Sequence, residues 1–253
     1  MCISSQTIYC MTKRHFIKFL LVLFTLLTSC AHQTYVNKKI ITAKKSFIKI
    51  ETFLEPLECE NISCEEQILY SSASGAVVLY DDKKHVLTAA HVCNANSDLF
   101  GPKEIEGYKA RFVLIDINDR RYEGEVVKTS FPIDSCLIYS EELDLPHIKL
   151  STKRPEYGEK VYNIAAPLGI SYREMIPLMV GQYSGDIGFK SYYTIPTAQG
   201  SSGSAIVNQK GELVGMIHSV HSRFHHIALS PTFSEMWNFL SALPDSHLMS
   251  KPE

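Results

Sequence analysis

Short β-rich segments recur along most of this chain, and polar or glycine-containing turns separate them. The turn Asn-Gln-Lys-Gly-Glu at 208–212, for example, lies between two apolar runs. Many short strands with frequent turns predict an all-β sandwich or barrel, and they argue against a parallel sheet with crossover helices. A polar break at 151–160 separates two groups of expected strands. They lie at 74–80, 85–89, 111–117, 123–128 and 135–140, then at 161–166, 177–185, 190–195, 204–208, 212–220 and 225–230.

One helix is expected after the last strand, at 231–243. Pro231 suits the first turn of a helix, where its missing N–H is not needed. The apolar side chains that then share one helical face are Phe233, Met236, Trp237 and Leu240. We expect this helix to pack across the β units with Trp237 in the core, and residues 246–253 to form a tail.

The first 29 residues have the order of a secretory signal. Basic residues precede the apolar run 19–29, which is too short to span a bilayer comfortably. The run leads into Leu-Thr-Ser-Cys at 27–30, which resembles the lipobox of bacterial lipoproteins. This resemblance implies a signal peptide at 1–29, an acylated Cys30, and a tether at 30–55 that ends in a first strand.

A lipobox also implies export to the bacterial envelope and attachment to the lipid bilayer through Cys30. Ala31, where an Asp would retain the protein at the inner membrane, favours the outer membrane. An ordinary membrane anchor with an incidental Cys is the alternative, and the chain offers two candidate start residues, Met1 and Met11.

Composition limits the remaining partners. An apolar content of 45% supports a buried core, and a net charge of −2 gives no general case for nucleic acid or an anionic surface. The lysines at 38–49 suit a solvated tether. Export permits disulfides, and Cys59 and Cys64 bracket a short polar loop that a disulfide could close. No Cys spacing is that of a zinc site, so we do not expect a metal.

The turn Gly200–Ser204 precedes a short apolar run. It predicts either a plain loop into a strand or a tight turn that presents one hydroxyl beside free backbone N–H groups. Such a hydroxyl needs a base and oxyanion donors to act as a nucleophile. His91 follows a β-like run, and Asp134 stands before an apolar strand, where an unpartnered carboxylate is unfavourable. The rival acids and hydroxyls are Asp116, Asp119, Asp144, Ser201 and Ser204.

Three motifs occur in an order that resembles the trypsin-like serine peptidases. They are Val-Leu-Thr-Ala-Ala-His at 86–91, Asp134 before its strand, and Gly-Ser-Ser-Gly-Ser at 200–204. Further segments, at 157–169, 179–185, 208–216 and 227–232, are similar to the second barrel of the bacterial HtrA-like branch. The resemblance implies two six-stranded antiparallel barrels of the chymotrypsin type within 56–245. The first would lie at about 56–150 and the second at about 155–230.

The resemblance also implies a role for each matching residue. Ser202 would be the nucleophile, His91 its general base, and Asp134 the carboxylate that orients the imidazole. The N–H groups of Gly200 and Ser202 would form the oxyanion hole. The implied substrate-binding positions are Pro196 at the pocket floor and the pairing strand Ile217, His218, Ser219 and Val220.

The chain departs from the family at several positions. Ser201 stands where an Asp would pair with a freed N-terminus, so that zymogen switch is not expected, and no PDZ domain is expected. Ser204 replaces the usual Gly, as in relatives that resemble glutamyl endopeptidases. Pro196 brings no acid to the pocket and Val220 replaces a Gly. These two residues predict a shallow pocket for small or aliphatic side chains.

Two smaller groups of residues remain open. Cys93 and Cys136 each follow a candidate site residue by two positions, and this fold would bring them close, either as a disulfide or as two reduced thiols. The histidines His218, His221, His225 and His226 lie around one hairpin. No acid or Cys completes a metal set there, and His218 could instead lie near Asp134 or recognise an acidic side chain.

The sequence therefore predicts a lipid-anchored serine endopeptidase that acts on proteins or peptides through an acyl-enzyme, without a cofactor. Two alternatives stay open. One is an inactive peptidase-fold lipoprotein that serves as a peptide-binding or envelope-interaction module, and the other is a structural lipoprotein with chance motifs.

Overall fold

The computed structural model describes residues 38–56, 68–94, 108–221 and 224–241. By its contacts the chain divides into Met1–Lys39 and Ile40–Glu253, and the second unit contains the β structure. No helix in the described ranges is long and apolar enough to cross a membrane. The expected features that lie outside the described residues are the signal peptide 1–29, Cys30, Cys59, Cys64 and the tail 246–253.

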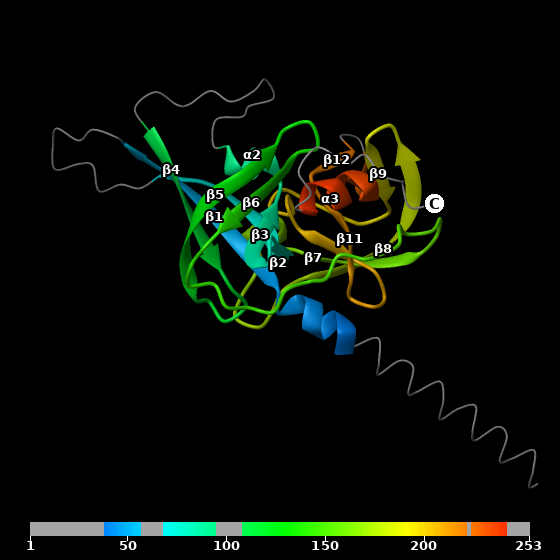
Figure 1. The fold of residues 1–253 in the computed structure, drawn as a ribbon, viewed down its shortest axis with the longest axis horizontal. Helices are drawn as coiled ribbons and strands as arrows, with labels where there is room; N and C mark the ends of the chain where they lie inside the picture. Colours follow the sequence, from blue (N-terminus) through cyan, green and yellow to red (C-terminus); the bar gives the residue numbers. More distant parts are fainter. Residues whose placement is uncertain (1–37, 57–67, 95–107, 222–223, 242–253) are drawn as a thin grey trace, which may run out of the picture. The chain divides into compact units, whose positions relative to one another are not determined.

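Six antiparallel strands close into a barrel, called here the first barrel, in the order β1-β2-β3-β6-β5-β4 (Figure 1). Their bounds are β1 Phe47–Pro56, β2 Ile68–Tyr80, β3 Lys83–Thr88, β4 Tyr108–Ile115, β5 Arg121–Ser130 and β6 Ser135–Tyr139. The barrel begins at Phe47 rather than at 56, because β1 pairs with both β2 and β4 and so closes the sheet. The first strand expected at the end of the tether is therefore an integral barrel strand.

The second group of strands forms a seven-stranded sheet in the order β11-β10-β7-β8-β9-β13-β12. Their bounds are β7 Lys160–Ile164, β8 Leu178–Ile187, β9 Lys190–Tyr193, β10 Ala205–Val207, β11 Leu213–Met216, β12 Ser219–His221 and β13 Phe224–Pro231. Seven strands form instead of six because the expected strand 212–220 is interrupted at Ile217 and His218. Both backbone groups of Ile217 there bond to the turn before β10: its N–H donates to Ser204 O (2.9 Å) and its carbonyl accepts from Gly203 N (2.6 Å). The predicted all-β class is confirmed.

The C-terminal helix α3 spans Phe233–Leu240 and is shorter than predicted. Pro231 is the last residue of β13 and pairs with Lys190 of β9, so it does not open the helix. Thr232 is the N-cap instead, and it forms a capping box with Glu235.

The buried face of α3 also differs from the prediction. The side chains that pack inward are Phe233, Met236, Phe239 and Leu240. Trp237 is 36% exposed and lies against the Phe233 ring, so its predicted place in the core is wrong. Phe239 fills that role, because the buried face is centred closer to Met236 than the apolar spacing indicated.

Candidate active site

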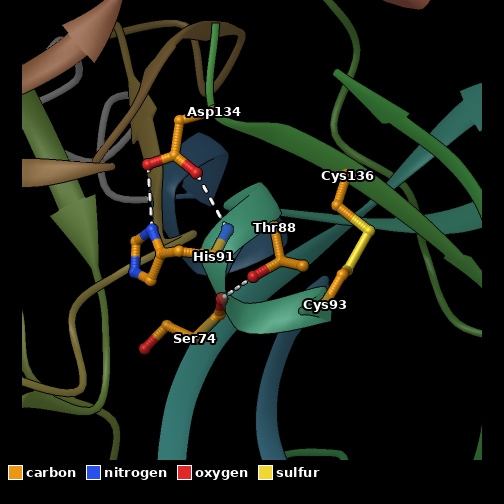
Figure 2. The surroundings of a disulfide bond; sticks show 6 residues. All are labelled: Ser74, Thr88, His91, Cys93, Asp134 and Cys136. Atoms are coloured by element: carbon orange, nitrogen blue, oxygen red, sulfur yellow. Dashed lines mark hydrogen bonds and ion pairs between the residues drawn. A yellow bond between two sulfur atoms is a disulfide. The ribbon is translucent and has the colours of Figure 1, made fainter. Parts of the chain in front are cut away.

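His91 and Asp134 meet at one end of the first barrel. Thr88 of β3 pairs with Cys136 of β6, so the residues just after β3 and just before β6 lie together. His91 sits on the single-turn helix α2, Ala90–Cys93, whose Ala90 and Val92 are buried. Asp134 Oδ2 accepts a hydrogen bond from His91 Nδ1 at 2.8 Å, and Asp134 Oδ1 accepts from the His91 backbone N–H at 2.9 Å (Figure 2).

The Asp134 carboxylate is held in its ionised form. Burial by itself raises the pKa of Asp134, but contacts from the imidazoles of His218 and His91 outweigh it and bring the pKa well below its usual range. A carboxylate at Nδ1 keeps the proton of a neutral imidazole on that nitrogen, so the lone pair of His91 is on Nε2. The pair therefore presents a base to whatever lies beside Nε2.

His218 supplies a second imidazole to the same carboxylate. Its Nδ1 lies 3.5 Å from Asp134 Oδ2, and its side chain is only 10% exposed. Of the roles that the sequence left open for His218, the structure places it beside Asp134. In the same hairpin, His226 packs on the ring of Phe224, while the side chain of His225 is not described.

A disulfide joins Cys93 to Cys136 and closes a sequence separation of 43 residues. Cys93 is the last residue of α2 and Cys136 lies in β6, so the bond ties together the two segments that carry His91 and Asp134 (Figure 2). The alternative of two reduced thiols does not hold in this structure. The cross-link limits how far His91 and Asp134 can separate.

The turn Gly200–Ser204 adopts a conformation that only glycine permits at two positions. Gly200 has φ +91° and Gly203 has φ +82°. A Cβ on Gly203 would lie 2.0 Å from Thr88 Oγ1 and 2.2 Å from Ser74 O. The second-sheet turn is therefore packed directly against the middle of β2, at Ser74, and the end of β3, at Thr88, in the first barrel.

Of the three hydroxyls in this turn, that of Ser202 is the accessible one. Ser201 and Ser204 are completely buried, whereas Ser202 is half-buried. The Ser202 carbonyl accepts from Ser74 N at 2.9 Å, and the Ser74 carbonyl accepts from Thr88 Oγ1 at 2.9 Å. These contacts bring Ser202 to the segment that leads into His91. Within the described part of the chain, however, no hydrogen bond joins the Ser202 hydroxyl to His91.

Other groups in the turn are tied to the surrounding structure. The carbonyls of Gln199 and Gly200 accept from Leu168 N (2.6 Å) and from Ser74 Oγ (2.8 Å). The N–H of Ser201 donates to the Ala198 carbonyl, and the N–H of Gly203 donates to the Ile217 carbonyl. The N–H of Ser204 donates to the Ser201 carbonyl.

Among the described residues, the N–H groups of Gly200 and Ser202 have no protein acceptor. In a trans peptide the N–H points away from the C=O, so the Gly200 N–H is directed away from Leu168. An oxyanion is stabilised by free N–H donors, and this turn offers two of them, on either side of Ser201, together with the half-buried Ser202.

The expected substrate-binding residues differ in how buried they are and in whether their backbone groups are already bonded. Ile217 is buried, and because both of its backbone groups bond to the turn, it has none left for an added strand. Ser219 and Val220 are half-buried at the edge of the second sheet, where β12 pairs with β13 on its other side. Pro196 is exposed.

Sequence reasoning missed Ser74. Its hydroxyl donates to Gly200 O (2.8 Å) and accepts from Ala166 N (2.9 Å), and the residue is completely buried in β2. No motif distinguished this serine from others in the strand. Its only signal in the sequence was a polar residue directly before the apolar run 75–80, and the turn that it contacts is far away along the chain.

Comparison with known proteins adds to this geometry. The sequence profile described as "Trypsin-like peptidase domain" matches residues 73–216, more than half of the chain. The fold resembles a serine endoprotease from Yersinia pestis (TM-score 0.60, 18% identity), over 80% of this chain and 64% of that one, less than two thirds of its length. It also resembles a protease from M. tuberculosis solved in its active form (TM-score 0.60, 16% identity), over 82% of this chain and 84% of that one. No curated protein matches the sequence. The expected chymotrypsin-like fold is confirmed.

Proposed function

This chain belongs to the family of trypsin-like peptidase domains, and on that basis we propose that it is a serine endopeptidase that hydrolyses peptide bonds through an acyl-enzyme on Ser202. The observation that carries the proposal is the His91–Asp134 pair, with Nδ1 of His91 at 2.8 Å from the carboxylate. A base oriented in this way is what a serine hydroxyl needs to become a nucleophile.

In the proposed reaction, the Ser202 oxygen attacks the carbonyl carbon of the scissile bond while Nε2 of His91 takes the hydroxyl proton. The N–H groups of Gly200 and Ser202 donate to the oxyanion that forms. His91 then gives its proton to the leaving amine as the C–N bond breaks. Water attacks the ester, His91 takes one proton from it, and Ser202 regains that proton when the acid leaves. Asp134 stays ionised throughout and stabilises the imidazolium.

The absence of a hydrogen bond between the Ser202 hydroxyl and His91 in the described part of the chain is compatible with this scheme. Hydrogen bonds of catalytic groups are often long in the absence of substrate and tighten when it binds. The Ser74 and Thr88 contacts hold the turn at the end of β3, the strand that leads into the helix with His91.

We assign the acyl side of the substrate to the edge formed by His218, Ser219 and Val220. Ile217 is left out of backbone pairing because its N–H and carbonyl already bond to the turn. The branched side chain of Val220 narrows the expected pocket, which favours small or aliphatic side chains before the scissile bond.

We also propose that the chain is exported and acylated at Cys30. The basic and apolar order of residues 13–29 supports a signal, and the disulfide Cys93–Cys136 supports folding in an oxidising compartment. Metabolic labelling with a palmitate analogue in a bacterial host tests this proposal. Wild type should carry the label and Cys30→Ser should not; a label that survives in Cys30→Ser contradicts the assignment.

Peptide hydrolysis by Ser202→Ala tests the proposed activity. The nucleophile acts together with its base, so its loss should lower kcat/KM by about 10,000-fold or more. Ser184→Ala is a matched control, because Ser184 is an exposed serine on β8 away from the turn. Retained turnover in Ser202→Ala rejects the nucleophile. A folded wild type without any turnover favours the alternative of an inactive peptide-binding module.

A further inference from the structure

Ser74 contacts the candidate site with every polar atom that it has. Its N–H donates to Ser202 O at 2.9 Å and its carbonyl accepts from Thr88 Oγ1 at 2.9 Å. Its hydroxyl donates to Gly200 O at 2.8 Å and accepts from Ala166 N at 2.9 Å. A residue of the first barrel is thus bonded to both ends of the second-sheet segment Gly200–Ser202.

The Ser74 hydroxyl makes two hydrogen bonds that an apolar side chain of the same size could not make. One oxygen serves as a donor to Gly200 and as an acceptor for Ala166, both in a buried setting. Without it, a carbonyl and an N–H would be left buried and unpaired, which is unfavourable for each. The site therefore depends on a serine-like group at position 74.

Gly200 is the residue that most needs such a restraint. With φ +91° and no side chain, its two flanking peptide groups can rotate more freely than those of other residues. Leu168 N holds the peptide before Gly200 through the Gln199 carbonyl, and Ser74 Oγ holds the peptide after it through the Gly200 carbonyl. With both flanking peptides held, the direction of the free Gly200 N–H is fixed.

We propose that Ser74 is a positioning residue for the oxyanion hole, which keeps the Gly200–Ser202 turn in the form that leaves the Gly200 and Ser202 N–H groups free. The inference rests on the proposed peptidase function. Ser74 acts through the turn and does not itself touch the reacting atoms.

The test compares Ser74→Ala with two matched variants. Ser74→Thr keeps the hydroxyl and is the conservative rescue. Ser46→Ala is the control, since Ser46 is also completely buried but its hydroxyl has no hydrogen-bond partner among the described residues. Active-site titration counts the folded, competent molecules in each preparation, so that kcat is not confused with partial unfolding.

Ser74→Ala should lower kcat by about tenfold to a hundredfold with KM changed less than about twofold, because an oxyanion donor acts mainly in the transition state. A peptide aldehyde forms a tetrahedral adduct on the serine, so its inhibition constant should weaken by a similar factor. Ser74→Thr should recover most of the loss, and Ser46→Ala should match wild type.

Three results would overturn the inference: an unchanged kcat in Ser74→Ala, a raised KM at unchanged kcat, or aldehyde inhibition that stays at the wild-type level while kcat falls. If Ser74→Ala does not fold, Ser74→Cys decides, since its weaker donor should give an intermediate loss of kcat. A wild type without turnover refutes the proposed function itself. Turnover in wild type with no effect at position 74 refutes only the role of Ser74.

Discussion

Removing the disulfide Cys93–Cys136 should destabilise the fold by an amount that follows from its position in the chain. The bond closes a sequence separation of 43 residues. In the chain-entropy treatment, closing a loop of that length lowers the entropy of the unfolded chain by about 13 cal/mol/K. At 25 °C this raises the free energy of unfolding by about 4 kcal/mol. The variant Cys93→Ala/Cys136→Ala should lose about this much free energy of unfolding.

Equilibrium urea unfolding at pH 7, followed by circular dichroism, measures the loss. The single variant Cys93→Ala breaks the same cross-link but keeps the buried Cys136 in place, so it separates the cross-link from packing at Cys136. The free energy of unfolding should fall by a similar amount in both variants. If both stay within about 1 kcal/mol of wild type, the constraint on the unfolded chain is not what stabilises this fold.

The same change should affect the site before it affects the whole fold. The helix that carries His91 has only four residues, and its N-cap makes no side-chain hydrogen bond. Without the disulfide, this helix should open locally at urea concentrations below the global transition. Turnover should then be lost before the circular dichroism signal changes. Coincident loss of the two signals contradicts this expectation.

Three other changes have defined outcomes. Gly203→Ala should lower the free energy of unfolding by about 3 kcal/mol or more in urea titration, because the new Cβ meets Thr88 and the φ of +82° is unfavourable for alanine. Burial opposes ionisation of Asp116, but hydrogen bonds from the Arg120 backbone and guanidinium lower the pKa of Asp116 below its ordinary value. Its ionised form therefore stabilises the fold above about pH 4 and less as pH falls through the lowered pKa. Asp116→Asn should be less stable than wild type at pH 7 and approach it in acid; an equal difference at both pH values contradicts this. Val220→Gly should shift kcat/KM toward larger side chains in a peptide library, and an unchanged preference rejects Val220 as the pocket wall.

Much of the fold was predictable because strand periodicity and turn residues are local signals. The expected segments 85–89 and 135–140 correspond to β3 and β6. The pairing of these two strands skips β4 and β5, so no local signal predicts it. The interruption at Ile217 was not predictable, because it comes from hydrogen bonds to the turn that precedes the neighbouring strand β10. Pro231 was misread for a similar reason: pairing with β9 outweighs its preference for the first turn of a helix.

Sequence spacing alone did not decide which aspartate orients His91, and the structure gives a physical reason for Asp134. Among the rival acids, Asp116 is buried and paired with Arg120, and Asp144 pairs with Lys84 on the surface. Neither is free to orient a histidine. Ser74 could not be found from the sequence, because its partners at 166, 200 and 202 come together only when the two β units pack.

Covalent labelling with a fluorophosphonate probe tests the central claim most directly, because the probe reacts with a serine hydroxyl that a neighbouring base activates. Digestion and mass spectrometry should place a single label on Ser202 in the wild type. The label should be absent in Ser202→Ala and strongly reduced in His91→Ala. A folded wild type that remains unlabelled, or a label at any other serine, contradicts the claim that His91, Asp134 and Ser202 act as one catalytic unit.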